Sequence, residues 1–526
     1  MRGEGVALAF GLALAAACGA PQAAPGPAAT PPAAELLWSV AGRPTPAARE
    51  AVAALVDAGA KGLDPGDYDA PALAAALHEL ARAREAAPGA AERFDSALDA
   101  SFSRFLSDLH AGRVRPASVR VGVGEGHGSF DARAAAGAAA RQGDVAAAIA
   151  AVEPELFLYR RVEEALGRYR ALATDPNAAP VRIQPVVHPG DPLASAPALR
   201  RWLAAVGDLA SAEATEPAAE GRYDAPLVEA VQRFQGRHGL EPDGVIGAAT
   251  ARALAVPAAI RVRQLELTLE RLRWLPPLGG QRIVAVNVPA FELWAFDAQR
   301  LQGRPALQMR VVVGRAVRWQ TPLLAGALNQ VEFHPDWEVP PRIAREEIVP
   351  LLSQRPGYLD AHDMELLRGN TPVPPTPENV AAIGASVRVR QRAGPQNPLG
   401  RVKFTFPNPE SVYLHDTPTR RAFRHSRRDF SHGCVRLEDA PGLALWLLSD
   451  VPGWSPERVE ESLAGEASFT VRLPRPVPIF LFYATALVEP DGRLLFFEDV
   501  YGHDRALERA LAERRSGASA SPGRTS

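Results

Sequence analysis

The feature that most constrains the fold is a change of pattern near Arg282. Before it, apolar residues recur at intervals of three and four, as in Leu98, Phe102 and Phe105, which is typical of helices. After it, runs such as "RIVAVNVPAFELWAF" and "RVKFTFPN" are rich in β-branched and aromatic residues and are bounded by Pro, Gly, Asn or Asp. We therefore predict a multidomain α+β protein, helical in its first part and mainly β in its second.

The β-rich part contains several short strands separated by turns, which favours a sandwich or a barrel. Further predicted strands are "LQMRVVVG", "SVRVRQ", "SVYLHD", "VPIFLFYATALVE" and "RLLFFEDV", and the last two are joined at Pro490-Asp491-Gly492. A helical interruption from about Pro341 to Leu367 lies inside this region. We expect an insertion at about 341–384 that forms a lid over a site, and a C-terminal tail over 504–526.

The helical part divides into two units. Residues 35–195 contain no cluster of chemically reactive side chains, so we expect a helical scaffold. Residues 196–258 hold a compact pattern in which Leu227, Val231 and Phe234 share one helical face. Taken alone, this pattern indicates a small helical module.

The N-terminus predicts export. Residues 1–18 carry one positive charge and a short apolar run, and residues 19–34 form a Pro/Ala-rich leader. "LAAAC", which ends at Cys18, resembles a bacterial lipobox with Ala15 where leucine is preferred. Lipidation of Cys18 and simple cleavage after an Ala-x-Ala sequence both remain open. No later window approaches twenty uninterrupted apolar residues, so we expect a soluble mature body.

Cys434 is the only cysteine left in the body of the chain. An intrachain disulfide is therefore excluded, and a lone thiol in an oxidising compartment is a liability unless it has a chemical role. The alternative is a buried cysteine that acts as a small hydrophobic residue. The CxxC or HxxxH spacing of zinc sites is missing, and the formal net charge of −2 with few aromatic residues gives no sign of nucleic-acid binding.

A catalytic thiol needs a base within hydrogen-bond reach and a group that holds that base. His415 ends a predicted strand 19 residues before Cys434, and Gly433 frees the backbone to bend, so that nearby amides point at a developing oxyanion. On this reasoning His415, His425 and His432 all remain candidates for the base.

The motifs "H-D-T-P" and "S-H-G-C-V-R" resemble those of the L,D-transpeptidase catalytic domain of the YkuD type. The stretches "VVVGRAVRWQTP", "FHPDWEVPPRIAREEIVP", "RQRAGPQNPLGRVKFTFPN" and "VYLHDTP" are similar to the large periplasmic members of that family. In addition, V-x-x-F-Q, G-L, D-G and T-x-x-A-L in the small module resemble a three-helix peptidoglycan-binding domain. The resemblance implies a catalytic domain over 282–503.

The resemblance also implies roles for single residues. Cys434 would be the nucleophile and His415 the general base, oriented by the backbone carbonyl of Asp416. His432 and Gly433 would shape the pocket and the oxyanion region, supported by Ser431. Arg436 would either contact the carboxylates of the donor peptide or brace the loop, and both roles stay open. Tyr413 and Trp337 are further expected contacts of the substrate.

The implied reaction is a double acyl transfer that uses no metal or cofactor. The thiolate would attack the third residue of a peptidoglycan tetrapeptide stem, release D-Ala and form a thioester, which an amine of diaminopimelate on a second stem would then attack. The family implies the periplasm of a Gram-negative bacterium and reaction with carbapenems. A lipoprotein lysine, a free D-amino acid or water remain alternative acceptors, and a non-catalytic wall-binding scaffold or a secreted cysteine peptidase are alternatives of another class.

Overall fold

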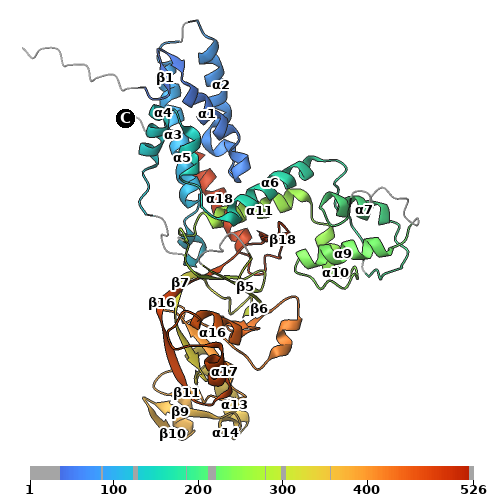
Figure 1. The fold of residues 1–526 in the computed structure, drawn as a ribbon, viewed down its shortest axis with the longest axis vertical. Coiled ribbons are helices and arrows are strands. Elements are labelled where there is room, and N and C mark those ends of the chain that lie inside the picture. The colour runs from blue at the N-terminus through green and yellow to red at the C-terminus, as the bar shows by residue number, and fades with distance from the viewer. Residues whose placement is uncertain are drawn as a thin grey trace, which may run out of the picture.

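The computed structural model describes residues 36–84, 87–122, 128–184, 186–210, 221–278, 280–297, 304–355 and 357–519. The predicted export signal, the leader and Cys18 lie outside the described residues. The molecule is elongated, with helices at one end, a β-sheet body at the other and a small helical module at one side (Figure 1). Within the described ranges, no helix combines the length and the apolar character that a membrane span requires.

The N-terminal end is a helical scaffold, as predicted. Its helices are α1 (Pro46–Val56), α2 (Ala70–Arg82), α3 (Ala90–Ala111), α4 (Ala132–Gln142) and α5 (Val145–Ala150). The predicted apolar face of α3 is buried at Leu98, Phe102 and Phe105, and Phe102 packs edge-on against Trp38. The hydroxyl of Thr45 accepts a hydrogen bond from the amide of Ala48 and caps α1.

Three helices connect this scaffold to the rest of the chain: α6 (Phe157–Thr174), α11 (Ala258–Leu272) and α18 (His503–Ser519). Most of the expected C-terminal tail over 504–526 is helical, because residues 503–519 form α18. Leu507 and Leu511, one helical turn apart, are buried in the main core. Arg514 pairs with Asp108 of α3 at 2.8 Å, so the end of the chain also ties the scaffold down.

The side module has three described helices, α7 (Ala196–Ala205), α9 (Ala225–Arg237) and α10 (Ala248–Leu254). The predicted face of Leu227, Val231 and Phe234 is buried. Gln235 explains the glutamine of the V-x-x-F-Q motif, because its amide nitrogen donates to Asp243, to the carbonyl of Val245 and to the hydroxyl of Thr250. This one side chain therefore holds α9, the Asp-Gly turn and α10 together.

The β-rich part forms a closed, barrel-like sheet with the order β12-β13-β15-β6-β5-β4-β16-β7-β3. β12 also pairs with β7, which closes the sheet on itself. The strands are β3 (Val121–Gly122), β4 (Ile283–Asn287), β5 (Glu292–Phe296), β6 (Leu307–Gly314), β7 (Leu323–Phe333), β12 (Val402–Thr405), β13 (Leu414–His415), β14 (Asp429–Ser431), β15 (Val435–Leu437) and β16 (Phe469–Phe482). β17 (Ala486–Val488) and β18 (Leu494–Phe496) pair as the predicted hairpin.

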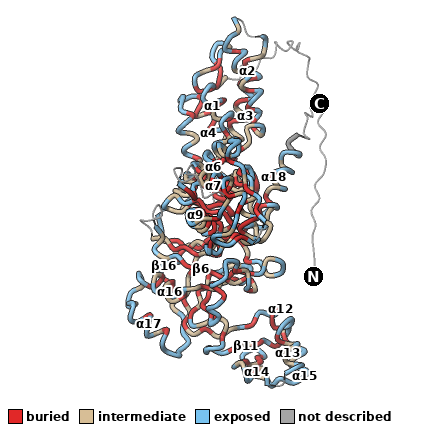
Figure 2. Tube along the Cα trace, turned by 90° about the vertical axis from the view of Figure 1, so that its right-hand side faces the viewer, coloured by how far each residue is buried: buried red, intermediate tan, exposed pale blue. Residues whose placement is uncertain are grey.

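Period-two alternation separates two faces of this sheet. Val402, Phe404, Leu414, Val435 and Leu437 point into the apolar core, which is closed on one side by α16 (Ala440–Leu448) and α17 (Pro456–Ala464). The residues between them, such as Lys403, His415 and Arg436, therefore lie together on the opposite face. Figure 2 shows the buried positions concentrated where the sheet meets the connecting helices.

The predicted lid is a separate small unit between Trp337 and Gln391, and it is only partly helical. Its helices are α12 (Pro341–Ile343), the π-helical turn η4 (Ala344–Ile348), α13 (Val349–Gln354), α14 (Tyr358–Ala361) and α15 (Pro377–Ala381). They pack on a four-stranded sheet of β8 (Trp337–Glu338), β9 (Met364–Arg368), β10 (Thr371–Val373) and β11 (Arg388–Gln391). The predicted strand "SVRVRQ" belongs to this unit rather than to the main sheet.

Candidate active site

Cys434 lies in the short loop that joins β14 to β15. Gly433 has φ = +115°, a conformation that a residue with a β-carbon rarely adopts, so the glycine is required for the turn before the thiol. Val435 donates its amide to the carbonyl of Tyr413 at 3.1 Å, which starts the parallel pairing of β15 with β13. Cys434 is thus held beside Tyr413 at the edge where both strands begin.

Two hydroxyl groups fix this loop. Ser431 Oγ accepts a hydrogen bond from the amide of Gly433 and donates to the carbonyl of Cys434 at 2.5 Å. Thr321 Oγ1 accepts from the amide of Gly314 and donates to the carbonyl of Gly433, each at 2.8 Å. The amide of Cys434 has no acceptor among the described residues, so it is available to an oxyanion. Sequence reasoning missed Thr321, although it lies in the quoted motif "VVVGRAVRWQTP".

His415 lies one strand away from the thiol and on the same face. Its register partner on β15 is Arg436, and its partner on β12 is Lys403. His415 Nδ1 lies 2.6 Å from the carbonyl oxygen of Asp416. Because a carbonyl only accepts, Nδ1 carries the proton and Nε2 is left with a free lone pair. This is the tautomer that a general base needs.

Burial controls the protonation of both reactive groups. Burial, reinforced by the positive charge of Arg436, lowers the pKa of His415 to about 3. Burial raises the pKa of the Cys434 thiol, and hydrogen bonds with Tyr413 together with the charges of Lys403 and Arg436 oppose this rise without cancelling it. At neutral pH the resting site therefore holds a neutral thiol and a neutral imidazole. No hydrogen bond joins these two side chains in the part of the chain that the structure describes.

Tyr413 connects the thiol to the lid unit. Tyr413 lies close enough to Cys434 and to Trp337 of β8 for both to affect its pKa, and burial raises that pKa, so the hydroxyl stays protonated. The Nζ of Lys403 lies 4.9 Å from the centre of the Tyr413 ring and 3.1 Å from a carboxylate oxygen of Glu332. Sequence reasoning assigned no role to Lys403. The rarity of lysine could have drawn attention to it, since the chain has only two lysines.

Arg436 is the charged group of this face that lacks a counter-ion. Its Nε is buried without a hydrogen-bond partner, and no described acid forms an ion pair with it. Burial lowers the pKa of Arg436, while the neighbouring Cys434 raises it. A guanidinium retained in this state is costly unless a ligand supplies the missing anion.

His432 faces away from the chemistry and toward the lid. Its Nε2 lies 2.6 Å from Glu347 Oε1 of η4, and its ring packs edge-on against Trp319. Arg342 of α12 stacks over the same tryptophan, with its guanidinium carbon 3.9 Å from the ring centre. These contacts join the lid unit to the loop that holds Cys434.

The side chains of Asp416 and Ser431 make hydrogen bonds to other groups of the protein. The carboxylate of Asp416 pairs with Arg420 at 2.7 Å and accepts the amide of Arg401, so only its carbonyl reaches the site. Ser431 is likewise occupied within its own loop. The described hydrogen bonds therefore engage both side chains within the protein. His425, the third candidate base, is exposed and packs against Phe430.

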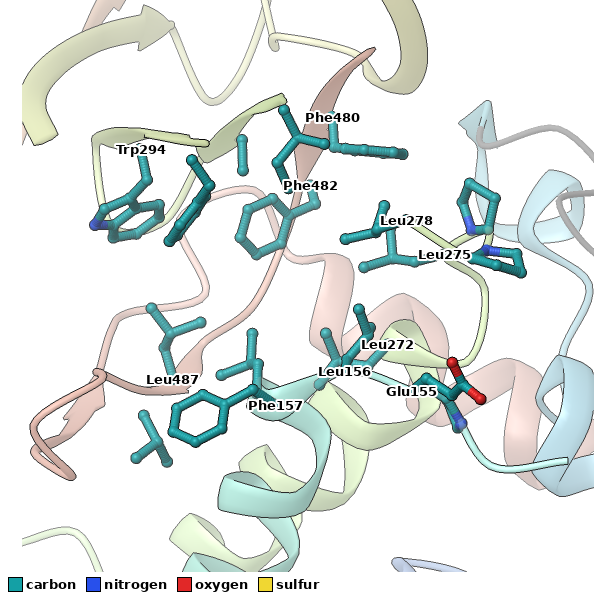
Figure 3. Close-up of a pocket in the computed structure, with 18 of the residues that line it drawn as sticks. Glu155, Leu156, Phe157, Leu272, Leu275, Leu278, Trp294, Phe480, Phe482 and Leu487 are labelled. Atoms are coloured by element: carbon teal, nitrogen blue, oxygen red, sulfur yellow. The ribbon is translucent and has the colours of Figure 1, made fainter. Parts of the chain in front are cut away.

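Among the described residues, no three His, Cys, Asp or Glu side chains gather closely enough to bind a metal ion. A cavity of about 770 Å³ lies elsewhere, on the outer face of β4, β5 and β16 (Figure 3). Trp294, Phe482 and Phe157 line it, and none of Cys434, His415 and Arg436 does. The cavity is therefore separate from the chemistry.

Three domain families match the chain. Residues 281–460 match the L,D-transpeptidase catalytic domain, YkuD. Residues 32–166 match the scaffold domain, and residues 195–254 match the "Putative peptidoglycan binding domain".

A protein of Haemophilus influenzae named "Putative L,D-transpeptidase" is 33% identical over 252 residues, which are 47% of this chain and 49% of that protein. The chain thus spans about half the length of this relative. Residues 281–460, which hold Cys434 and His415, thus belong to the YkuD family of L,D-transpeptidase catalytic domains, and a scaffold domain and a peptidoglycan-binding domain precede them in the same chain.

Proposed function

We propose that the protein cross-links peptidoglycan by joining the third residues of two stem peptides through a thioester on Cys434. One observation carries the proposal: a free thiol, an imidazole with an available Nε2 and an unpaired guanidinium lie on one face of adjacent strands. These are the three groups that acyl transfer from a carboxylate-bearing donor requires: nucleophile, base and anion-binding group.

In the first half-reaction, Arg436 binds a carboxylate of the donor stem and places the carbonyl of its third residue at Cys434. His415 Nε2 takes the thiol proton as sulfur attacks, because a neutral thiol must lose its proton before or during the attack. The amide of Cys434 and the hydroxyl of Tyr413 stabilise the oxyanion. The imidazolium then returns the proton to the leaving amine, and D-Ala departs.

In the second half-reaction, the side-chain amine of diaminopimelate on an acceptor stem attacks the thioester carbonyl. His415 accepts the proton that the amine loses, and the proton passes to sulfur as the new amide forms. The lowered pKa keeps the imidazole of His415 neutral at neutral pH, but it also makes the imidazole a weak base, so each proton transfer needs the developing negative charge at the site to stabilise the imidazolium.

The role of the lid in these two half-reactions is to keep water away from the thioester. Water competes with the acceptor amine for the thioester, and hydrolysis would only trim the stem. The contacts of Glu347 with His432 and of Arg342 with Trp319 hold the lid over the nucleophile loop, and Trp337 extends from the lid unit to Tyr413.

Incubation with purified muropeptides, followed by mass spectrometry of the products, tests the proposal. We expect a dimer linked between two third residues, together with free D-Ala. A trimmed tripeptide alone would identify water as the acceptor, and exchange of the terminal residue would identify a D-amino acid. A product that contains a lipoprotein lysine would identify an anchoring enzyme. If a carbapenem did not acylate Cys434, the two remaining alternatives would be a non-catalytic wall-binding scaffold and a cysteine peptidase.

The small module would act as a tether that raises the local concentration of the polymer. Deletion of 223–257 is expected to spare carbapenem acylation while it weakens co-sedimentation with intact sacculi. Unchanged co-sedimentation would show that the module is a spacer, and loss of acylation would show that it supports the catalytic domain. The proposed setting is the periplasm, with attachment to the outer membrane if Cys18 is lipidated.

A further inference from the structure

A short basic segment forms one border of the active site. We call residues 420–428 the arginine segment, because five of its nine positions are arginine and none is acidic: Arg420, Arg421, Arg424, Arg427 and Arg428. The segment lies between the strand that ends in His415 and the loop that holds Cys434. The function proposed above gives no role to it.

The register of the sheet places this segment on the catalytic face. Val312 of β6 pairs with Arg436 of β15, so the two side chains point the same way. Ala422 and Phe423, in the helical turn η5 (Arg420–Arg424), are buried against Val312. The apolar side of η5 is therefore seated directly beside Arg436, and its arginines border the site.

Only part of the positive charge of the segment is neutralised. Arg420 pairs with Asp416, Arg427 pairs with Asp429 at 2.7 Å, and the buried Arg428 donates to backbone carbonyls. Arg421 and Arg424 are exposed, and no described acid forms an ion pair with either.

Arg315, at the end of β6, extends the unpaired charge toward the thiol. Its amide donates to the carbonyl of Ser431 at 3.0 Å, its side chain is exposed, and it too has no ion pair among the described residues. Its charge is close enough to Arg436 to lower the pKa of that guanidinium, after the larger effect of burial. Unpaired guanidinium groups thus border the site outside the lid.

The segment also adjoins the small helical module. Glu498 lies 4.0 Å from Arg427 of the segment and 3.9 Å from Arg252 of α10. In Figure 1 the module and the loop that holds η5 project from the same side of the molecule. The arginine segment therefore lies close both to the small module and to the strand that follows Cys434.

We propose that the arginine segment, together with Arg315, binds the carboxylates of stem peptides on polymeric peptidoglycan and so holds the acceptor stem beside Cys434. The inference rests on the proposed function. The lid occupies another border of the site through its contacts with His432 and Trp319, which leaves the segment as the border toward the module. Stem peptides carry several carboxylates, and guanidinium is the side chain best matched to them.

The test replaces two charges and compares two matched variants. Arg421→Gln/Arg424→Gln removes the two unpaired arginines of the segment. Arg49→Gln/Arg82→Gln removes the same charge from α1 and α2 at the far end of the molecule, where both arginines are exposed and unpaired among the described residues. Three rates are measured for each: carbapenem acylation, D-Ala release from a tetrapeptide donor, and formation of the cross-linked product with polymeric acceptor.

We expect the segment variant to form cross-links about fivefold more slowly at low salt, the loss expected from removing two exposed ion pairs. Its carbapenem acylation and D-Ala release should match those of the control, because donor binding and the nucleophile are untouched. The difference should disappear at high salt, where exposed charges are screened. It should also disappear with an acceptor whose carboxylates are converted to amides.

Equal cross-linking by the two variants, in a protein that releases D-Ala, would overturn the inference and leave the proposed function standing. No D-Ala release from the unaltered protein would overturn the proposed function and, with it, the inference. Binding of the unaltered protein to vesicles of anionic phospholipid, lost in the segment variant while cross-linking is unchanged, would assign the segment to a membrane surface and overturn its role at the acceptor.

Discussion

The molecule contains two clusters of buried charge that differ in one respect. Where the scaffold meets α11, Glu270 is fully buried and is bound by Arg113 and Arg273, and Arg273 also donates to the hydroxyl of Tyr159 at 2.8 Å. Burial alone would raise the pKa of Glu270, but Arg113 and Arg273 outweigh it and hold the pKa below its ordinary value. In the active site, by contrast, Arg436 forms no ion pair with any described acid, and its Nε is buried without a hydrogen-bond partner.

The difference separates structural from functional use of the same chemistry. A buried charge whose hydrogen bonds are all made stabilises one arrangement of the chain and is expensive to disturb. A buried charge without a partner keeps part of its desolvation cost, and a ligand of opposite charge can recover it. We call the cluster of Glu270, Arg113 and Arg273 the scaffold joint. We therefore expect substitutions in the scaffold joint to change stability and substitutions in the active site to change the reaction rate.

The largest effect should come from the nucleophile. Cys434→Ala is expected to abolish carbapenem acylation and cross-linking, because no other described cysteine is present. The free energy of unfolding should change by no more than about 1 kcal/mol, since the thiol supports no structural contact network. Mass spectrometry and thermal unfolding measure the two quantities. Turnover above background in the purified variant would remove Cys434 from its assigned role.

The scaffold joint should show the opposite behaviour. Glu270→Gln leaves Arg113 and Arg273 without their carboxylate and is expected to cost about 3–5 kcal/mol of unfolding free energy. Glu229→Gln is a matched control, because Glu229 forms an exposed helical pair with Arg233, and it should cost no more than about 0.5 kcal/mol. Denaturant unfolding measures the free energy of unfolding of both variants. A small change in this free energy for Glu270→Gln as well would mean that the scaffold joint tolerates an unpaired charge.

The base should matter for rate alone. His415→Ala is expected to slow carbapenem acylation at least about a hundredfold, the usual scale for loss of a general base. His432→Ala should be much milder, since His432 contacts Glu347 of the lid. Stopped-flow fluorescence or intact-mass kinetics measures both rates. A more severe defect in the His432 variant would exchange the roles of the two histidines.

Removal of the guanidinium of Arg436 compares a buried charge without a partner directly with the paired charges around Glu270. Arg436→Gln should lower the rate of D-Ala release from a carboxylate-bearing donor about tenfold, as expected for one lost charge-assisted hydrogen bond. Stability should stay the same or rise, unlike that of the Glu270 variant, because no buried partner is left behind. A loss of stability as large as that of Glu270→Gln would show that Arg436 braces the loop.

The pH dependence is the mildest test. The raised pKa of Cys434 means that the thiolate fraction keeps growing above neutral pH, and the lowered pKa of His415 means that no imidazolium holds a thiolate at lower pH. Alkylation by iodoacetamide should rise about tenfold per unit from about pH 6 to about pH 9. A plateau that begins below about pH 7 would instead indicate a preformed thiolate–imidazolium pair.

Local patterns predicted most of the secondary structure. The three- and four-residue spacing of α3 and the period of two in β4, β5, β6 and β12 mark elements whose apolar face is visible in the sequence. β7 was not predicted, although it pairs with β16, β12 and β3. Its Gly326 weakens the strand signal, yet a β-carbon there would lie 2.5 Å from the ring of Phe406, so packing rather than propensity requires the glycine.

The strands of the lid unit and the helix near the C-terminus could not be assigned from local sequence, for a related reason. The strand "SVRVRQ" has the pattern of any short strand, and only pairing with β8 and β9 assigns it to the lid unit. α18 ends the chain in a segment rich in charge, but Leu507 and Leu511 bury against the core and Arg514 finds Asp108. Both outcomes depend on partners that are distant in sequence.

The sequence alone determined the elements with strong local periodicity, the thiol without a cysteine partner and the motif around Cys434 and His415. The tertiary structure decided that Asp416 presents its carbonyl to His415, that Thr321 holds the nucleophile loop and that Arg436 remains without an acid. The physical reason is that propensity and periodicity act over a few neighbouring residues. Burial, hydrogen-bond pairing and pKa are set by groups that the folded sheet brings together from β6, β12, β13 and β15.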